Sequence, residues 1–205
     1  MRKLLSSVLL IFVATSVQSQ ERIKFASLND KMQVHGDLYL PEGRQGKVPA
    51  MVVIHGTAGV DSRTKYFAEE LPKHGIAAFV VDFRTGVFTT ASNRPKNDEF
   101  LPSAYAALRV LRGRSDIDPA RIGIMGFSLG GHLSLTAALI ENKSRWLGGD
   151  PNFSVHVSYY PGCRYFIPKL TSTSQMDGPL MVFWGTNDSY GDGESCPKLK
   201  EALAP

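Results

Sequence analysis

A serine enclosed by glycines is the residue best suited to chemistry in this sequence. The stretch Gly126-Phe127-Ser128-Leu129-Gly130 fits the pattern Gly-x-Ser-x-Gly, and Gly131 extends it. An apolar run ends before the serine and a helix-like segment begins after it, so Ser128 falls at a strand-to-helix turn, beside the positive end of the helix. We expect Ser128 to be a nucleophile for acyl transfer. The alternative is a glycine-rich turn whose serine merely caps the helix.

Acyl transfer also requires N–H donors aimed at the oxygen that becomes negatively charged. The stretch His55-Gly56-Thr57-Ala58-Gly59 follows a predicted strand, the chain position at which a site built on such a strand-to-helix turn has its donor loop. The second donor is the amide just after the nucleophile. We therefore predict an oxyanion hole made by the amides of Thr57 and Leu129. The alternative for the first loop is a plain turn that ends a strand.

A carboxylate that could orient the catalytic base follows a later apolar run. Gly185-Thr186-Asn187-Asp188 comes directly after residues 180–184. Asp188 thus lies beyond Ser128 in the chain, in the order expected for such a site. Asp192 is its competitor, and we favour Asp188 because it is nearer the end of the strand. A solvated turn carboxylate is the alternative for either residue.

The base that should take the proton from the serine is missing from its usual place. This role normally falls to a histidine that follows the acid in the chain. No histidine follows Asp188. Each of the five histidines has a structural explanation. His35 and His156 lie in predicted strands, His55 belongs to the donor loop and His74 ends a helix. His132 lies one helical turn past Ser128 and faces the packing neighbours of that helix.

Short apolar runs that alternate with helix-periodic segments must position these residues. The run Ala50–Ile54 has no polar interruption, which indicates a strand buried on both faces of a sheet. The alternation predicts an α/β fold with a mostly parallel sheet and helices on both faces. The expected strands are 23–28, 33–40, 49–55, 76–81, 121–127, 154–160 and 180–184, and the expected helices are 61–73, 100–111, 129–140 and one beginning within 194–204.

The first nineteen residues have the order of a secretory signal peptide. Two basic residues precede an apolar run that is too short to span a bilayer, and small residues follow up to Ser19, where we expect cleavage. We therefore expect a secreted or periplasmic protein with one domain over residues 20–205. In an oxidising compartment Cys163 and Cys196 form either a disulfide or two buried thiols, and the sequence leaves both open.

Composition narrows the class of partner. The chain has 205 residues, of which 43% are hydrophobic and 20% charged, as is usual for a soluble domain with a substantial core. The formal charge of +4 is scattered among acidic residues, so no nucleic-acid partner is expected, and no membrane contact is expected after signal cleavage. Arg84, after a predicted strand, either binds a substrate carboxylate or pairs with a surface acid. Oligomeric state is left open.

Four segments together resemble the dienelactone hydrolase family of α/β-hydrolases. They are His55-Gly56 with Gly59, residues 126–131, Tyr160-Pro161-Gly162-Cys163 and residues 185–188. The resemblance implies an α/β-hydrolase fold, a small-molecule ester substrate, no metal and no organic cofactor. The family's namesake enzymes carry a cysteine where this chain has Ser128. That departure points away from dienelactone and toward general carboxylic-ester hydrolysis.

The resemblance also implies elements beyond those that the sequence supplies. Members of the family would add one more strand, a loop that bears the histidine and a closing helix. We therefore expect a C-terminally truncated α/β-hydrolase that lacks the last strand and helix, with impaired esterase activity and low solubility. The alternatives are a catalytically inactive α/β-hydrolase-fold binding protein and a peptidase on the same fold.

Overall fold

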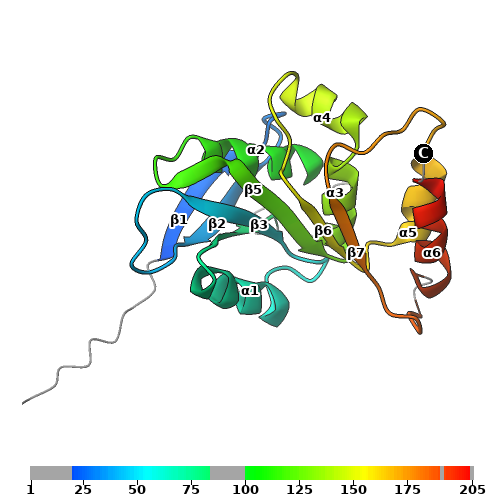
Figure 1. The fold of residues 1–205 in the computed structure, drawn as a ribbon, viewed down its shortest axis with the longest axis horizontal. Coiled ribbons are helices and arrows are strands. Elements are labelled where there is room, and N and C mark those ends of the chain that lie inside the picture. The colour runs from blue at the N-terminus through cyan, green and yellow to red at the C-terminus, as the bar shows by residue number, and fades with distance from the viewer. Residues whose placement is uncertain (1–19, 84–99, 190–191, 204–205) are drawn as a thin grey trace, which may run out of the picture.

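The computed structural model describes residues 20–83, 100–189 and 192–203, and these build one seven-stranded sheet (Figure 1). The strand order is β1-β2-β4-β3-β5-β6-β7. β2 pairs antiparallel with both β1 and β4. All the other neighbouring strands, from β4 to β7, pair parallel. The strands are β1 (Gln20–Ala26), β2 (Gln33–Tyr39), β3 (Val48–Ile54), β4 (Ala77–Asp82), β5 (Ile117–Phe127), β6 (His156–Tyr159) and β7 (Leu180–Phe183).

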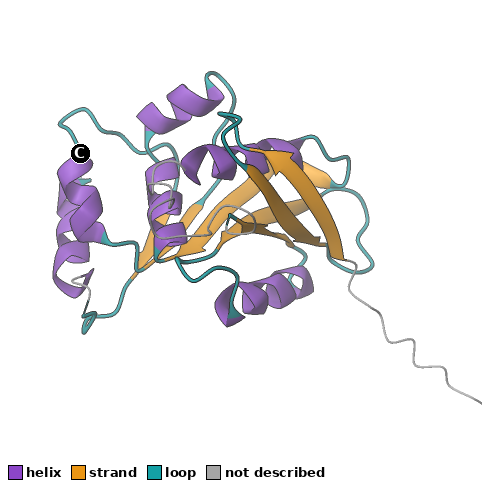
Figure 2. Ribbon diagram, turned by 180° about the vertical axis from the view of Figure 1, so that it is seen from behind, coloured by secondary structure: helices purple, strands orange, loops and turns teal. Residues whose placement is uncertain are grey.

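Helices cover both faces of this sheet, as Figures 1 and 2 show from opposite sides. One face carries α1 (Ser62–Lys73), and the other carries α2 (Leu101–Arg112) and α3 (Leu129–Ala137). The remaining helices are α4 (Ile140–Leu147), α5 (Cys163–Phe166), the short 3₁₀ helix Ile167–Lys169 and α6 (Asp192–Ala202). Within the described part of the chain, no helix is both long and apolar enough to cross a membrane. The predicted α/β-hydrolase architecture is confirmed.

The two faces of β3 explain how the sheet holds its helices. Successive side chains of a strand point to opposite faces. Val52 and Ile54 join the large core cluster under α2 and α3, whereas Met51 and Val53 belong to the cluster under α1. Because helices cover both faces of the sheet, the side chains on both faces of this strand must be apolar, which explains the uninterrupted apolar run in the sequence.

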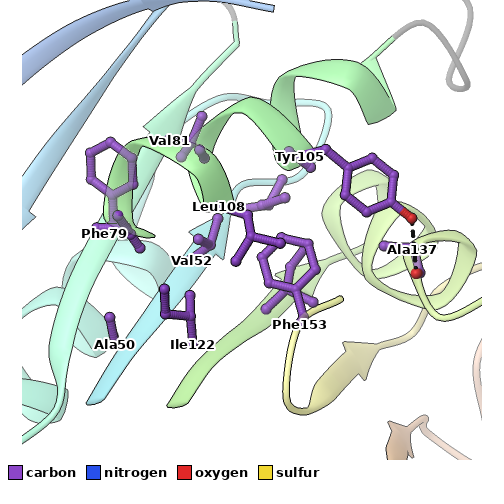
Figure 3. Packing of buried hydrophobic residues seen from close by; sticks show 14 of the residues in the cluster. Ala50, Val52, Phe79, Val81, Tyr105, Leu108, Ile122, Ala137 and Phe153 are labelled. Carbon is purple, nitrogen blue, oxygen red and sulfur yellow. Dashed lines mark hydrogen bonds between the residues drawn. The ribbon is translucent and has the colours of Figure 1, made fainter. Parts of the chain in front are cut away.

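Figure 3 shows the larger of these two clusters. Phe79 and Val52 fill the space between sheet and helix, and the Tyr105 ring from α2 stacks on Phe153 with centroids 6.0 Å apart. The Tyr105 hydroxyl is buried, and it donates a 3.0 Å hydrogen bond to the carbonyl oxygen of Ala137 at the end of α3. Burial raises the pKa of this tyrosine. The bond joins α2 to the helix that follows Ser128.

The ends of α1 follow the signals in the sequence. Asp61 is the N-cap and accepts the backbone N–H of Arg63 at 3.0 Å, while the Thr64 hydroxyl accepts the N–H of Asp61 at 3.1 Å. This reciprocal arrangement is a capping box. After the helix, Gly75 has φ +77°, a conformation that glycine adopts without strain.

Several predicted boundaries are wrong, including those of β1, predicted over 23–28, and of β6, predicted over 154–160. The helix expected over 129–140 ends at Ala137, where the side-chain amides of Asn142 and Asn152 bond the carbonyl oxygens of Thr136 and Ala137, and a separate helix α4 begins at Ile140. The strand β5 begins at residue 117, and α6 begins two residues earlier than expected. The predicted signal peptide, Arg84 and the turn-rich stretch after it lie outside the described residues.

Candidate active site

Ser128 lies at a strained turn between β5 and α3. Its backbone has φ +52° and ψ −110°, which is unfavourable for any residue with a side chain. The turn is held on both sides, because the Ser128 amide donates to the Tyr159 carbonyl at 3.0 Å and the His132 amide donates to the Ser128 carbonyl at 2.8 Å. The Ser128 side chain makes no helix-capping hydrogen bond. The capping alternative therefore finds no support, and backbone strain of this kind is typical of functional positions.

The glycines of the motif allow this turn to pack against its neighbours. A Cβ on Gly126 would lie 2.3 Å from backbone atoms of Gly130, and a Cβ on Gly130 would lie 2.4 Å from the Ile54 carbonyl oxygen. A Cβ on Gly131 would lie 2.5 Å from the Tyr159 carbonyl oxygen. All three distances are far below van der Waals contact. Only glycine at these three positions therefore lets α3 pack directly against the backbone of β3 and β6.

The four residues predicted for the site come together around one pocket of about 450 Å³. Thr57, Ser128, Leu129 and Asp188 all line it. They come from loops that follow β3, β5 and β7, and the carboxyl ends of these parallel strands meet at the same edge of the sheet. Leu129 is the first residue of α3, and the first N–H groups of a helix have no partner within the helix. This placement suits a donor to an oxyanion.

The two candidate carboxylates have different surroundings. Asp192 is only 2% exposed, and its two oxygens accept the backbone N–H groups of Gly162 at 2.8 Å and Cys163 at 2.7 Å. Asp188 is half-buried, and both residues border the pocket. Because the oxygens of Asp192 already hold the start of α5, Asp188 is the better candidate for orienting a base.

The cysteines, left open by the sequence, are joined. Cys163 at the start of α5 and Cys196 in α6 form a disulfide with a Cα–Cα distance of 5.1 Å. Both residues are buried. The bond and the Asp192 carboxylate together fix α6 to the loop that follows β6.

One histidine lies nearer the site than the sequence suggests. We expected His132 to face only packing neighbours, and its ring does pack edge-on against Phe166. It nevertheless also lines the pocket with Ser128, and it is the only histidine among the described residues that does so. The imidazole of His156 is fully buried at the start of β6, and burial lowers its pKa from 6.5 to about 4.

Sequence reasoning missed a cation at the pocket. Arg63 donates hydrogen bonds to the Asp61 carboxylate and, through Nη1, to the Tyr160 hydroxyl. Arg63 and Tyr160 both line the pocket. Hydrogen bonding to Asp61 raises the pKa of Arg63, and the same bond lowers the pKa of Asp61. Tyr160 has φ +38°, a second strained residue beside Ser128. Arg63 and Tyr160 belong to no shared motif, so the sequence gives no signal of the pair.

Metal ligation finds little support in the described ranges. Their one group of three candidate ligand residues is Cys163, Asp192 and Cys196. The two sulfur atoms are bonded to each other, and the carboxylate accepts two backbone amides. The donor set therefore does not fit a metal ion.

Comparison with known proteins assigns the family. The family model described as "Dienelactone hydrolase family" matches residues 34–205. The chain belongs to the dienelactone hydrolase family. An acetylxylan esterase from Xylanibacter ruminicola is 32% identical over 160 residues, which are 74% of this chain and 30% of that protein. An uncharacterized protein of Mycobacterium tuberculosis is 28% identical over 200 residues, 93% of this chain and 70% of the relative.

Solved structures support the fold. A dienelactone hydrolase-like promiscuous phosphotriesterase from metagenomic libraries superposes with a TM-score of 0.67 at 20% identity, covering 89% of this chain and 76% of that one. A lidless α/β serine hydrolase from Xanthomonas campestris gives a TM-score of 0.62 at 18% identity, covering 90% and 79%. At these identities the likeness shows the α/β-hydrolase fold alone. The family and its esterase-named relative support a hydrolase.

Proposed function

We propose that this member of the dienelactone hydrolase family hydrolyses carboxylic esters of small molecules with Ser128 as nucleophile. The observation that carries the proposal is the strained Ser128 turn, which opens into a pocket shared with Thr57, Leu129 and Asp188. Strain of this kind persists only where the surrounding structure enforces it. The esterase-named relative adds support for the class of substrate.

The reaction follows from the arrangement of these groups. The Ser128 Oγ attacks the ester carbonyl, its proton passes to a base, and the carbonyl oxygen becomes an oxyanion facing the amides of Thr57 and Leu129. Collapse of the tetrahedral intermediate breaks the bond to the alcohol, which leaves with a proton and leaves an acyl-serine. Water then attacks the acyl-serine and releases the carboxylic acid. Asp188 would orient the protonated base.

We further propose that residues 20–205 by themselves turn over esters slowly, because among these residues no histidine follows Asp188 to act as the base. A site without one member of the triad keeps only about 10³ to 10⁴ of acceleration over water. The test is hydrolysis of p-nitrophenyl acetate by residues 20–205, with Ser128→Ala as control. Weak turnover that vanishes in the variant supports both parts. Rapid turnover that vanishes refutes only the impairment, and equal turnover in both proteins refutes Ser128 as nucleophile.

A second candidate function is an α/β-hydrolase-fold binding protein without catalysis. The observation that favours it is that His132, the one histidine of the described residues at the pocket, packs its ring edge-on against Phe166. Under this proposal the pocket binds a small ester but does not cleave it. Titration with phenyl acetate, followed by NMR over a day, separates the two functions: unchanged ester at saturating protein supports binding alone, and Ser128-dependent release of acetate supports the hydrolase.

We propose that the mature protein is secreted or periplasmic. The signal-like residues before Gln20 and the Cys163–Cys196 disulfide support this location, since disulfides persist mainly in oxidising compartments. Expression of the full chain in a bacterium, followed by fractionation and intact-mass measurement, tests it. A periplasmic product that begins at Gln20 is expected, and an uncleaved cytoplasmic product contradicts it.

A further inference from the structure

The first residue of the donor loop, His55, is buried and contacts the rest of the loop, residues 56–59, through its side chain. The imidazole of His55 is only 1% exposed. Its Nδ1 lies 2.6 Å from the carbonyl oxygen of Gly56, and its Nε2 lies 3.1 Å from the backbone nitrogen of Phe83. The Phe83 ring also packs edge-on against it. One ring thus links the loop after β3 to the end of β4.

These two partners determine where the ring carries its proton. A carbonyl oxygen can only accept, so Nδ1 must donate to Gly56. A backbone N–H can only donate, so Nε2 must accept from Phe83. His55 is therefore the neutral tautomer protonated at Nδ1. A carboxylate oxygen of Asp82 lies 3.5 Å from Nε2, and in this tautomer both atoms are acceptors, so they do not form a hydrogen bond.

The bonded carbonyl of Gly56 shares a rigid peptide group with the amide of Thr57. The described chain contains no cis peptide bond, and in a trans peptide the C=O and N–H groups point in opposite directions. The Gly56 oxygen is held by His55 and also accepts the Gly59 amide at 3.1 Å. Fixing this oxygen therefore fixes the direction of the Thr57 N–H, on the opposite side of the same plane.

The other contacts of Gly56 place this peptide against the nucleophile. A Cβ on Gly56 would lie 3.6 Å from the Ser128 Cβ and 3.3 Å from the Phe127 carbonyl oxygen. Thr57 lines the pocket beside Ser128. The peptide plane that His55 orients is therefore next to the position at which an oxyanion would form.

We propose that His55 is a positioning residue for the oxyanion hole: as the Nδ1–H tautomer it holds the Gly56 carbonyl and thereby aims the Thr57 amide at the tetrahedral intermediate. This inference rests on the proposed function of Ser128. A donor stabilises the intermediate only if it points to where the charge develops, and the loss of one such donor lowers rates by about 10² to 10³.

The first experiment reads the tautomer in the wild-type protein. In the chain over residues 20–205 labelled with ¹⁵N-histidine, long-range ¹H–¹⁵N spectra distinguish a protonated ring nitrogen from an unprotonated one. His55 should show a protonated Nδ1 and an unprotonated Nε2. The opposite tautomer would overturn the proposal. This measurement needs neither turnover nor a folded variant.

The second experiment compares two variants that each keep one half of the bridge. In His55→Asn the side-chain amide nitrogen lies near the place of Nδ1 and can still donate to Gly56. In His55→Gln the amide lies near the place of Nε2 and can still accept from Phe83, but the Gly56 carbonyl loses its side-chain donor. The probe is phenylboronic acid, whose tetrahedral adduct with a serine mimics the intermediate at equilibrium without turnover. Its affinity is measured by calorimetry.

We expect His55→Gln to bind phenylboronic acid about 10- to 100-fold more weakly than wild type, and His55→Asn to bind within about threefold of it. Equal affinity of His55→Gln and wild type would overturn the proposal, and so would equal weakening in both variants, which would point to lost packing. The failure of the proposed function has a different signature. In that case Ser128→Ala binds phenylboronic acid as tightly as wild type.

Discussion

The buried disulfide should supply a large part of the stability of this protein. Cys163 and Cys196 are separated by 33 residues, and the loop between them carries β7 and Asp188. Cross-linking a loop of this length reduces the entropy of the unfolded chain by an amount equivalent to about 4 kcal/mol at 25 °C. The double variant Cys163→Ala/Cys196→Ala should therefore lower the free energy of unfolding by about 4 kcal/mol or slightly more, because two buried sulfur atoms are also lost.

The assay is urea unfolding of residues 20–205, followed by far-ultraviolet circular dichroism, for the oxidised wild type and the double variant. For a chain of this size the predicted loss corresponds to a fall in Tm of about 8 to 15 °C. Wild type unfolded and refolded in reducing agent serves as a second form without the bond and should match the variant. If the free energy of unfolding of the variant lies within about 1 kcal/mol of that of oxidised wild type, the reasoning is refuted. Contacts other than the disulfide would then constrain the loop in the unfolded chain.

Three further perturbations follow from the packing. Gly126→Ala should destabilise the protein by about 3 kcal/mol in urea unfolding, because the new Cβ would lie 2.3 Å from backbone, whereas Gly149→Ala, with no atom within 4 Å, should change little. His156 is protonated below about pH 6.5 in the unfolded chain but only near pH 4 in the folded chain. Between pH 8 and pH 5 the free energy of unfolding of wild type should therefore fall by about 2 kcal/mol more than that of His156→Leu. An equal fall in both proteins would contradict this. Asp192→Asn should lower the free energy of unfolding by about 2 kcal/mol, because one of the two backbone amides that the carboxylate accepts would then face an NH₂ group. Asp188→Asn should lower it by less, because Asp188 is only half-buried, and the reverse order in thermal melts would contradict the roles assigned to the two residues.

The site was predictable where one short segment contains the reason for its structure. Residues 126–131 place glycines at the positions where a side chain would collide with neighbouring backbone, so the strand-turn-helix around Ser128 follows from the sequence itself. The donor loop and Asp188 follow from the ends of apolar strands. Parallel strands bring those ends to one edge, which is why the four predicted residues share a pocket.

Contacts between distant segments were not predictable. Arg63 and Tyr160 are 97 residues apart, and their hydrogen bond depends on how the start of α1 meets the loop after β6. The end of α3 depends on Asn142 and Asn152, which take the last carbonyl groups of the helix from outside it. Asp192 was interpreted as a competitor for the acid, but its burial against the amides of α5 is a tertiary feature with no local signal.

The most direct test of the central claim is the site of covalent modification by a fluorophosphonate, which reacts with nucleophilic serine hydroxyls and reacts slowly where the base is missing. Residues 20–205 are incubated for a day with excess reagent, and the adduct is located by peptide mass spectrometry. The account predicts a single adduct on Ser128 and none in Ser128→Ala. An adduct on another residue, an adduct that persists in the variant, or no adduct in wild type would contradict it.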